Sequence, residues 1–464
     1  MEEKIWSSIK ITQRGIRNGR QVLGFTIPIK KLRGIKANEG DFIRVNIKKG
    51  DIEAHYYIFV NKKCHSRKKL QIRKAIPKEI IAKLRLKDND LIKFKVSLIN
   101  NIRKEKLIIK GYIDILAAIP KRTKSNKEIM LDYCYKRNKG FCHVWYCSGQ
   151  GKKIEPIRLN RWIKINCELG EFFGLMQAES RKAGTKFDFT NNLISEHKLF
   201  TKVAENFGIK KQSWKYSFFY NPYMKEEDTN IQVSKFKKEF NISHKVNLIK
   251  NERLTKVAFC SYINSTLLGW IMTNILCQLR SEMGRQRSNN ERATNFRKGF
   301  ISKVLLGDGT VVLNKANKGL DISISEQDPQ SQKDIKRILK KEEIGSYFMQ
   351  NRIDLLTGFE EYLWLLKNNA FINHPNRKKM IRCILSNFYV NCFYTRLREK
   401  IDKEQFQKKH KLNKNTTNIY LYRNYKRGYL IKKGKTYELS KKGKEAISIL
   451  KNAEKELKSS LTNT

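Results

Sequence analysis

The sequence lacks long apolar runs. None of its apolar stretches reaches the roughly 18 uninterrupted residues that a membrane-spanning helix requires. Its first residues, MEEKIWSSIK, also lack the pattern of a secretory signal peptide. These absences argue against a membrane or secreted protein, so we expect a cytoplasmic protein with no membrane partner.

Cysteine is also scarce. The 9 cysteines in 464 residues are scattered and odd in number, which does not fit a disulfide framework. One local group, Cys134, Cys142, His143 and Cys147, has the residue types of a zinc site without the close paired spacing of a zinc ribbon or finger. Buried free thiols are the simpler interpretation, and a zinc site is the alternative.

Acidic residues are the third shortage. The chain has 44 Asp and Glu against 97 Lys and Arg, which gives a formal net charge of +53. So basic a chain favours a polyanionic partner, and in the absence of membrane segments nucleic acid is the natural one. The length suits about three domains, and 40% hydrophobic residues can form buried cores.

The N-terminal region contains an internal repeat. IPIKKLRGIKANEGDFIRVNI begins at Ile27 and IPKEIIAKLRLKDNDLIKFKV begins at Ile76, with equal spacing from the proline to the later Gly-Asp or Asn-Asp pair. Each copy predicts a short helix that starts after the proline, a turn, and a strand in which apolar and polar residues alternate, such as Ile92, Phe94 and Val96.

This repeat resembles the swapped-hairpin DNA-binding domains of the AbrB and SpoVT type, in tandem, over residues 1 to about 120. In that family two such units form one β-barrel, normally by dimerisation. The resemblance therefore implies a swapped-hairpin β-barrel that forms within one chain and binds DNA. A barrel that only stabilises the protein or mediates other contacts is the alternative.

The central region contains two apolar helices that each end in an acid. Asn166 is a suitable N-cap for a helix through CELGEFFGLMQAES, which reaches its acid at Glu179. Gly174 and Ala178 lie on one face of this helix, where another backbone can approach closely. Downstream, FRKGFISKVLLGDGTV reaches Asp308 in the same way, so we expect the two helices to pack on each other.

Such packing would bring Glu179 and Asp308 together. A carboxylate is disfavoured at a helix C-terminus, where the dipole is already negative, and two carboxylates repel each other. A hard divalent ion such as Mg²⁺ would offset both effects, because it prefers oxygen ligands and can also hold a phosphate. The pair therefore predicts a Mg²⁺ site for phosphodiester cleavage, with Mn²⁺ as a substitute.

A strand with one polar and one apolar face follows each helix. In KFDFTNN the apolar face carries Phe187 and Phe189, and in GLDISIS it carries Leu320, Ile322 and Ile324. The opposite faces are polar and would contact nucleic acid. Their residues are Lys186, Asp188, Thr190, Asp321, Ser323 and Ser325.

Residues from about 161 to 390 resemble a monomeric, two-repeat LAGLIDADG homing endonuclease. The resemblance implies a pseudo-twofold αββαββα core whose two motif helices form the interface, with two sheets that contact the major groove. By position, Glu179 and Asp308 are then the catalytic, metal-binding acids. Gln177 stands where the motif often has a carboxylate, and we expect it to be dispensable.

The chain departs from this family pattern in three places. Ser180 replaces the final glycine of the first motif, and Lys303 replaces the interior small residue of the second. We expect Lys303 to hold the helices apart or to extend its ammonium group to solvent. The segment GSYFMQNRIDLLTGFEEYLW also leaves little room for the last strand pair of the second repeat.

From Ile401 the sequence predicts two helices and a hairpin. The second helix is capped at Asn413 and ended by Gly428, and the hairpin YLIKKGKTYELS turns at Gly434. This resembles a winged helix-turn-helix domain, in which the second helix enters the major groove and the wing meets phosphates. The residues at these positions are Lys414, Asn415, Thr416 and Asn418 on the helix, and Lys432, Lys433 and Lys435 on the wing. A winged helix used for protein contacts is the alternative.

Together these patterns predict a multidomain α+β protein. We expect a tandem barrel over residues 1–122, a linker or insert over 123–160, the endonuclease core over 161–390 and the winged helix over 391–464. The expected function is homing-type, metal-dependent cleavage of both strands of duplex DNA by a monomer.

Two other functions remain as alternatives. One is a DNA-binding transcriptional regulator with a degenerate nuclease core, and the other is an RNA maturase that binds intron RNA, since members of the family assist splicing. Competing nuclease chemistries have less support, because the 7 histidines show no paired-His pattern and no Gly-rich phosphate loop is present.

Overall fold

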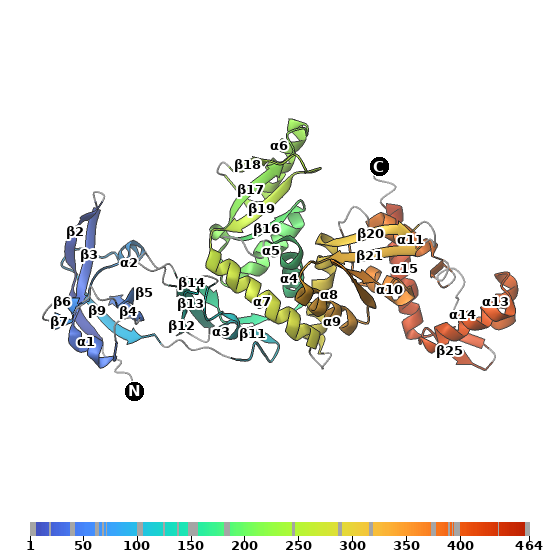
Figure 1. The fold of residues 1–464 in the computed structure, drawn as a ribbon, viewed down its shortest axis with the longest axis horizontal. Coiled ribbons are helices and arrows are strands. Elements are labelled where there is room, and N and C mark those ends of the chain that lie inside the picture. The colour runs from blue at the N-terminus through green and yellow to red at the C-terminus, as the bar shows by residue number, and fades with distance from the viewer. Residues whose placement is uncertain are drawn as a thin grey trace. The chain divides into compact units, whose positions relative to one another are not determined.

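A computed structural model of the protein describes residues 6–17, 20–37, 42–60, 65–66, 69–70, 72–99, 105–123, 126–136, 139–146, 156–180, 186–243, 246–285, 290–314, 319–372, 377–387, 390–391, 393, 400–434 and 436–459. The chain divides into two compact units. Unit 1 comprises Met1–Arg103 and Lys121–Arg158, and unit 2 comprises Lys104–Pro120 and Leu159–Thr464. Both combine helices with small sheets, so the expected α+β class is confirmed (Figure 1). Within the described ranges, no helix combines the length and apolarity needed to cross a bilayer.

Unit 1 begins with two antiparallel sheets and two short helices. The first sheet has the strand order β1-β9-β4-β5, the second has the order β2-β3-β8, and β6 and β7 form a separate hairpin. The elements are β1 (Ser7–Lys10), β2 (Thr12–Arg17), β3 (Arg20–Ile27), α1 (Ile29–Gly34), β4 (Phe42–Lys49), β5 (Ile52–Phe59), β6 (His65–Ser66), β7 (Lys69–Leu70), β8 (Ile72–Ala75), α2 (Lys78–Leu84) and β9 (Leu91–Leu98).

The internal repeat forms two equivalent strand–helix–strand units. Pro28 and Pro77 are the N-cap residues of α1 and α2, as the sequence predicts. In the second copy the turn before β9 contains Asn89, whose φ is 68°; residues 40–41 of the first copy lie outside the described residues. The equivalent strands pair with each other in antiparallel fashion, β3 with β8 and β4 with β9, as a twofold relation between the copies requires.

The expected closed barrel is not observed among the described strands. The two sheets share no strand, and each keeps its own edges. They instead pack around one common core, in which the rings of Phe25 from β3 and Phe94 from β9 are 5.2 Å apart. Burial of both apolar faces therefore comes from stacking two sheets rather than from closing one, which corrects the barrel prediction.

The segment 123–160, expected to be a linker or insert, contains regular structure. Its strands are β12 (Ile129–Lys136), β13 (Lys139–Tyr146) and β14 (Ile157–Asn160), in the order β12-β13-β14. Within unit 1, the Tyr57 hydroxyl of β5 donates a 3.0 Å hydrogen bond to Asp132 and lies 2.7 Å from His143 Nδ1. The β12–β13 hairpin is thus attached to the first sheet.

A smaller sheet of unit 2 contains β10 (Ile108–Ile109), β11 (Tyr112–Asp114) and β15 (Trp162–Lys164), with α3 (Ile115–Ala118) after β11.

The first half of the central region, from α4 to α7, contains a four-stranded sheet with the order β16-β19-β17-β18. Phe187 and Phe189 of β16 are buried against Phe200 of α5, at ring distances of 5.5 and 4.6 Å. The elements are α4 (Cys167–Glu179), β16 (Phe187–Asn191), α5 (Ile194–Asn206), η2 (Lys211–Ser213), β17 (Lys215–Tyr220), α6 (Glu226–Phe240), β18 (Asn247–Lys250), β19 (Ala258–Ile263) and α7 (Thr266–Arg285).

The second half, from α8 to α11, has a sheet with the order β20-β21-β23-β22. Its elements are α8 (Glu291–Gly307), β20 (Gly309–Asn314), β21 (Gly319–Ser325), α9 (Pro329–Lys341), β22 (Ser346–Met349), β23 (Arg352–Leu355), α10 (Phe359–Lys367) and α11 (Arg377–Ser386). The segment expected to leave little room does form a strand pair, because β22 and β23 are short and a tight turn joins them. That expectation is therefore wrong.

The two halves share a sheet core and differ at its edges. The order β16-β19-β17 corresponds to β21-β23-β22. Among the described residues, the first half has no counterpart of β20. It instead carries an additional helix and strand, α6 and β18, and β18 extends the sheet by pairing parallel to β17.

The C-terminal segment forms the expected two helices and hairpin. Asn413 caps α14 by accepting a 2.7 Å hydrogen bond from the Thr416 amide. Gly428 and Gly434 have φ angles of 77° and 60°, which glycine adopts easily at a helix end and a hairpin turn. The elements are β24 (Lys400–Asp402), α13 (Lys403–Lys409), α14 (Lys414–Lys426), β25 (Leu430–Lys433), β26 (Thr436–Leu439) and α15 (Lys441–Ser459).

Candidate active site

Two glycine-lined helices, α4 and α8, form the centre of unit 2 (Figure 1). A methyl group placed on Gly170 would lie 2.0 Å from the Phe296 carbonyl oxygen, and one on Gly299 would lie 2.4 Å from that of Cys167. Both glycines lie 9 residues before the terminal acid of their helix, so equivalent positions of the two helices form the contact. The predicted packing of these helices on each other is confirmed.

The acid-bearing ends of α4 and α8 lie side by side. A methyl group on Gly307, the last residue of α8, would lie 2.5 Å from Ala178 Cβ and 3.2 Å from Glu179 Oε1. Asp308 follows Gly307 as the C-cap residue of α8. The helix contact thus brings Glu179 and the backbone next to Asp308 together from positions far apart in the sequence.

Glu179 has an uncommon environment for a carboxylate. It is half-buried at the end of α4, and burial raises the pKa of its carboxyl group above the ordinary value for glutamate. A 3.0 Å hydrogen bond from Asn191 Nδ2 to Glu179 Oε1 partly opposes that rise. Among the described residues, no Lys, Arg or His forms an ion pair with this carboxylate, which leaves it suited to a cation from outside the chain.

Asp308 is anchored through its backbone. Its amide donates to the Val304 carbonyl at 2.9 Å, which closes the last turn of α8, and its carbonyl accepts from the Ser325 amide at 3.0 Å. These bonds join the end of α8 to the end of β21. The backbone of the half-buried Asp308 is therefore fixed by hydrogen bonds to both α8 and the end of β21.

The donor set of this helix end suits Mg²⁺. Within the described ranges, no three His, Cys, Asp or Glu side chains converge as a closed metal site would require. Mg²⁺, however, is commonly held by one or two carboxylates together with water and substrate phosphates. Glu179 and Asp308 are the residues that would hold the ion.

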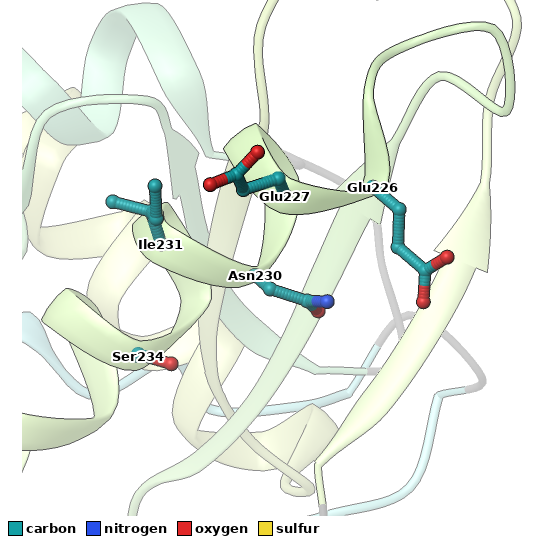
Figure 2. Close-up of a pocket in the computed structure, with 5 residues that line it drawn as sticks. All are labelled: Glu226, Glu227, Asn230, Ile231 and Ser234. Carbon is teal, nitrogen blue, oxygen red and sulfur yellow. The ribbon is translucent and has the colours of Figure 1, made fainter.

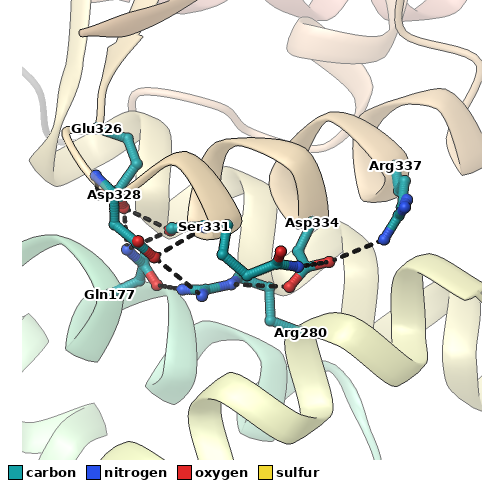
Figure 3. A network of polar contacts seen from close by, with 8 residues as sticks. Gln177, Arg280, Glu326, Asp328, Ser331, Asp334 and Arg337 are labelled. Carbon is teal, nitrogen blue, oxygen red and sulfur yellow. Dashed lines mark hydrogen bonds and ion pairs between the residues drawn. The ribbon is translucent and has the colours of Figure 1, made fainter.

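Gln177 lies in a buried polar network between α4, α7 and the start of α9 (Figure 3). Its Oε1 accepts a 2.5 Å hydrogen bond from Arg280, and its Nε2 donates one of 2.5 Å to Glu326. Gln177 is only 1% exposed, and both sides of its amide are engaged. Gln177 therefore joins the two halves through buried hydrogen bonds. The expectation that it is not essential for function stays a prediction.

Lys303 corrects an expectation based on the sequence. It neither separates the helices nor reaches solvent: the residue is 7% exposed, and its ammonium group lies 2.6 Å from Glu196 Oε2 on α5. Gly174 of α4 makes room for it, because a methyl group there would lie 2.8 Å from Lys303 Cβ. A buried ion pair thus accommodates Lys303 within the contact between α4 and α8.

Breaking this pair on one side should destabilise unit 2. Lys303→Met leaves the Glu196 carboxylate buried without its partner, and Glu196→Leu leaves the Lys303 ammonium group buried without its partner. Each substitution should lower the free energy of unfolding by about 3–5 kcal/mol. The double variant removes both charges of the pair, so it should cost far less than the sum of the two single losses. Urea unfolding of the four proteins measures the coupling, and additive losses would contradict the ion pair.

The polar strand residues differ in exposure. Lys186, just before β16, is exposed, whereas on the strand Thr190 is half-buried and Asp188 is only 4% exposed. Asp188 is therefore poorly placed to contact a ligand in this conformation. On β21, Asp321 and Ser325 are exposed and Ser323 is half-buried. The second sheet therefore presents the expected polar face more fully than the first.

The predicted recognition helix α14 presents a basic and aromatic face. Lys414 and Asn415 are exposed, and Thr416 and Asn418 are half-buried. Lys432 and Lys433 of the hairpin are exposed, Lys433 is paired with Glu438 at 2.7 Å, and Lys435 lies outside the described residues. Two further candidates on the same helix are Tyr422 and Tyr425, which are 56% and 40% exposed and were not predicted as contact residues. Their spacing of three residues along a capped helix could have indicated that both tyrosines lie on one face.

The cysteine group of β12 and β13 does not form a zinc site among the described side chains. Cys142 and His143 are consecutive on β13, so they point to opposite faces and cannot bind one ion together. Cys142 is buried, as expected. The Cys134 side chain and all of Cys147 lie outside the described residues.

A surface hollow on α6 is a weaker candidate (Figure 2). Its lining residues are Glu226, Glu227, Asn230, Ile231 and Ser234. All of these lining residues come from one helix. The acid-bearing end of α4 and α8 is therefore the better candidate for chemistry.

Comparison with known proteins does not extend this description. No model of a known protein family matches the sequence, and no protein of curated function matches it. A functional assignment therefore depends on the residues and geometry described above.

Proposed function

We propose that this protein is a site-specific DNA endonuclease of the LAGLIDADG type that cuts both strands with a divalent metal ion. The observation that carries this proposal is the glycine-mediated contact of α4 and α8, which places two acid-ended helices side by side. Both acids belong to one chain, so a monomer supplies a complete pair. The order helix, sheet strands and helix in both halves is consistent with a pseudo-twofold core.

The flanking segments support duplex DNA as the substrate. The antiparallel pairing of equivalent strands in unit 1 is consistent with a tandem swapped-hairpin arrangement. The C-terminal helices and hairpin fit a winged helix whose exposed lysines would contact phosphates. The formal charge of +53 favours such contacts along a long site. Both flanking segments would then add affinity and register to the central cut.

The residues of the chain have separate roles in this chemistry. The packed glycines set the separation of α4 and α8, and Glu179 and Asp308 supply the oxygen ligands at their ends. A bound Mg²⁺ ion would polarise the scissile phosphate and lower the pKa of an attacking water. The exposed polar face of β21 would orient the duplex.

Mapping of DNA ends after incubation with the protein tests this proposal. Genomic DNA of the source organism is incubated with the full chain in Mg²⁺, and in parallel in EDTA. We expect discrete double-strand breaks at one or few sites in Mg²⁺ alone. The breaks identify the target, which then serves for measurements of binding and rate.

Other outcomes would identify the alternatives. Tight binding of duplex DNA without breaks in Mg²⁺ or Mn²⁺ would contradict the nuclease and favour a DNA-binding regulator. Preferential binding of structured RNA over duplex DNA, again without breaks, would favour a maturase.

A further inference from the structure

We propose that Asn191 is a positioning residue for Glu179, holding its carboxylate at the acid-bearing end of α4 in the orientation that receives the metal ion. This inference rests on the proposed nuclease function and extends it to a residue outside the motif helices. Asn191 is the last residue of β16. It reaches α4 from the sheet, so the acid is held from a second element.

The amide of Asn191 is fixed in orientation at both ends. Its Oδ1 accepts a 2.8 Å hydrogen bond from the Leu193 amide, which forms a tight turn before α5. The carbonyl side of the amide is thereby committed to the backbone. The NH₂ group must then face the other way, where Nδ2 donates to Glu179 Oε1 at 3.0 Å. The contact follows from the turn and not from a chance rotamer.

The backbone of Asn191 is held in turn by a buried histidine. His197 of α5 is 0% exposed, and its Nε2 lies 3.1 Å from the Asn191 carbonyl oxygen. Because burial lowers the pKa of His197 to about 4, the ring is neutral at pH 7. The carbonyl can only accept, so Nε2 is the donor in this contact, and Nδ1 lies 2.8 Å from the Ser261 hydroxyl oxygen. A chain of three contacts thus ends on Glu179.

The second half of the central region does not repeat this donor. Glu326 occupies the equivalent place, three residues before its helix α9, as Asn191 does before α5. Glu326 also closes a turn, accepting from the Asp328 amide at 3.0 Å, but its other oxygen accepts from Gln177 at 2.5 Å. The residue at this place in the second half is therefore an acid and not an amide, so the contact described here for Glu179 is specific to an asparagine.

Titration with Mn²⁺ tests the inference with a readout other than cleavage. Electron paramagnetic resonance measures free Mn²⁺ in the presence of the full chain, with wild type, Asn191→Ala and Asn191→Asp. We expect Asn191→Ala to bind Mn²⁺ about 10-fold more weakly, because loss of a supporting hydrogen bond leaves the ligand less well oriented. Asn191→Asp can still accept the hydrogen bond from the Leu193 amide, so the turn before α5 is kept. It replaces the NH₂ donor with an oxygen that cannot donate to Glu179, so it tests the loss of that hydrogen bond alone.

Rescue by metal separates positioning from a general loss of structure. At the mapped target, raising Mn²⁺ should restore the cleavage rate of Asn191→Ala toward that of wild type, whereas Glu179→Gln should not recover. Asn264→Ala, which alters an exposed asparagine, is the matched control and should resemble wild type throughout. Equal thermal unfolding midpoints for these proteins would exclude misfolding as the cause.

The outcomes distinguish this inference from the proposed function. If wild type binds Mn²⁺ and cleaves DNA while both Asn191 variants match it in Mn²⁺ affinity, the positioning role is wrong and the nuclease stands. If wild type shows neither Mn²⁺ binding that Glu179→Gln removes nor metal-dependent cleavage, the nuclease proposal fails and this inference fails with it.

Discussion

Replacement of Glu179 by glutamine, or of Asp308 by asparagine, is expected to reduce Mg²⁺-dependent cleavage by ~10³-fold or more, because a metal ion that polarises a phosphate contributes several kcal/mol to lowering the barrier. Each substitution preserves side-chain size and removes one anionic ligand. The affinity for duplex DNA should change little, since phosphate contacts elsewhere dominate it. The measurements are single-turnover cleavage and equilibrium binding at the mapped target.

The stability of Glu179→Gln provides the control for this prediction. Burial raises the pKa of Glu179 in the folded protein, whereas the unfolded chain has the ordinary value. The folded state therefore binds the Glu179 proton more tightly than the unfolded state does. Above the folded pKa, the ionised carboxylate lowers the free energy of unfolding, and this loss of stability vanishes as pH falls below the ordinary glutamate pKa. Without metal at pH 7, Glu179→Gln should unfold at the same temperature as wild type or higher.

Thermal unfolding in EDTA at pH 7 and pH 4 measures this difference. Loss of cleavage together with a lower midpoint at pH 7 would show that Glu179 supports the fold and not the chemistry. Loss of cleavage with an unchanged or raised midpoint is the pattern of a functional acid that costs stability.

Replacement of Gly170 by alanine is expected to disrupt the contact between α4 and α8. The added methyl group would lie 2.0 Å from the Phe296 carbonyl oxygen, which is backbone and cannot rotate away. The helices would have to separate, at an expected loss of roughly 3 kcal/mol or more in the free energy of unfolding of unit 2. Cleavage should fall as well, because the separation of the two acids depends on the same contact.

A second glycine serves as the matched control. Gly34, the last residue of helix α1, has nothing within 4 Å of an added methyl group. Gly34→Ala should therefore be neutral or slightly stabilising, by up to ~1 kcal/mol, since alanine favours the helix. Urea unfolding of both variants provides the comparison. Equal small effects at Gly170 and Gly34 would show that α4 and α8 are not in close contact.

Much of the candidate site could be predicted from local sequence. The Asn166 cap, which accepts a 2.9 Å hydrogen bond from the Leu169 amide, depends on neighbouring residues alone. The small residues of α4 and α8 indicated a close contact because only backbone without bulky side chains can approach so near. The strand positions were less reliable. Alternation correctly placed Phe187 and Phe189 in the core, but it did not predict that Asp188 would also be buried.

The sequence by itself determined the acid-ended helices, the duplicated N-terminal units and the helix ends of the C-terminal segment. These features follow from periodicity, caps and turns, which act over a few residues. Only the tertiary structure decided the partners of the buried polar groups. Lys303 meets Glu196 across 107 residues of chain, and Gln177 meets Glu326 across 149. Such pairs depend on where separate elements pack, so no local pattern specifies them. The contact of Asn191 with Glu179 has the same origin, since a strand end and a helix end meet only in the folded core.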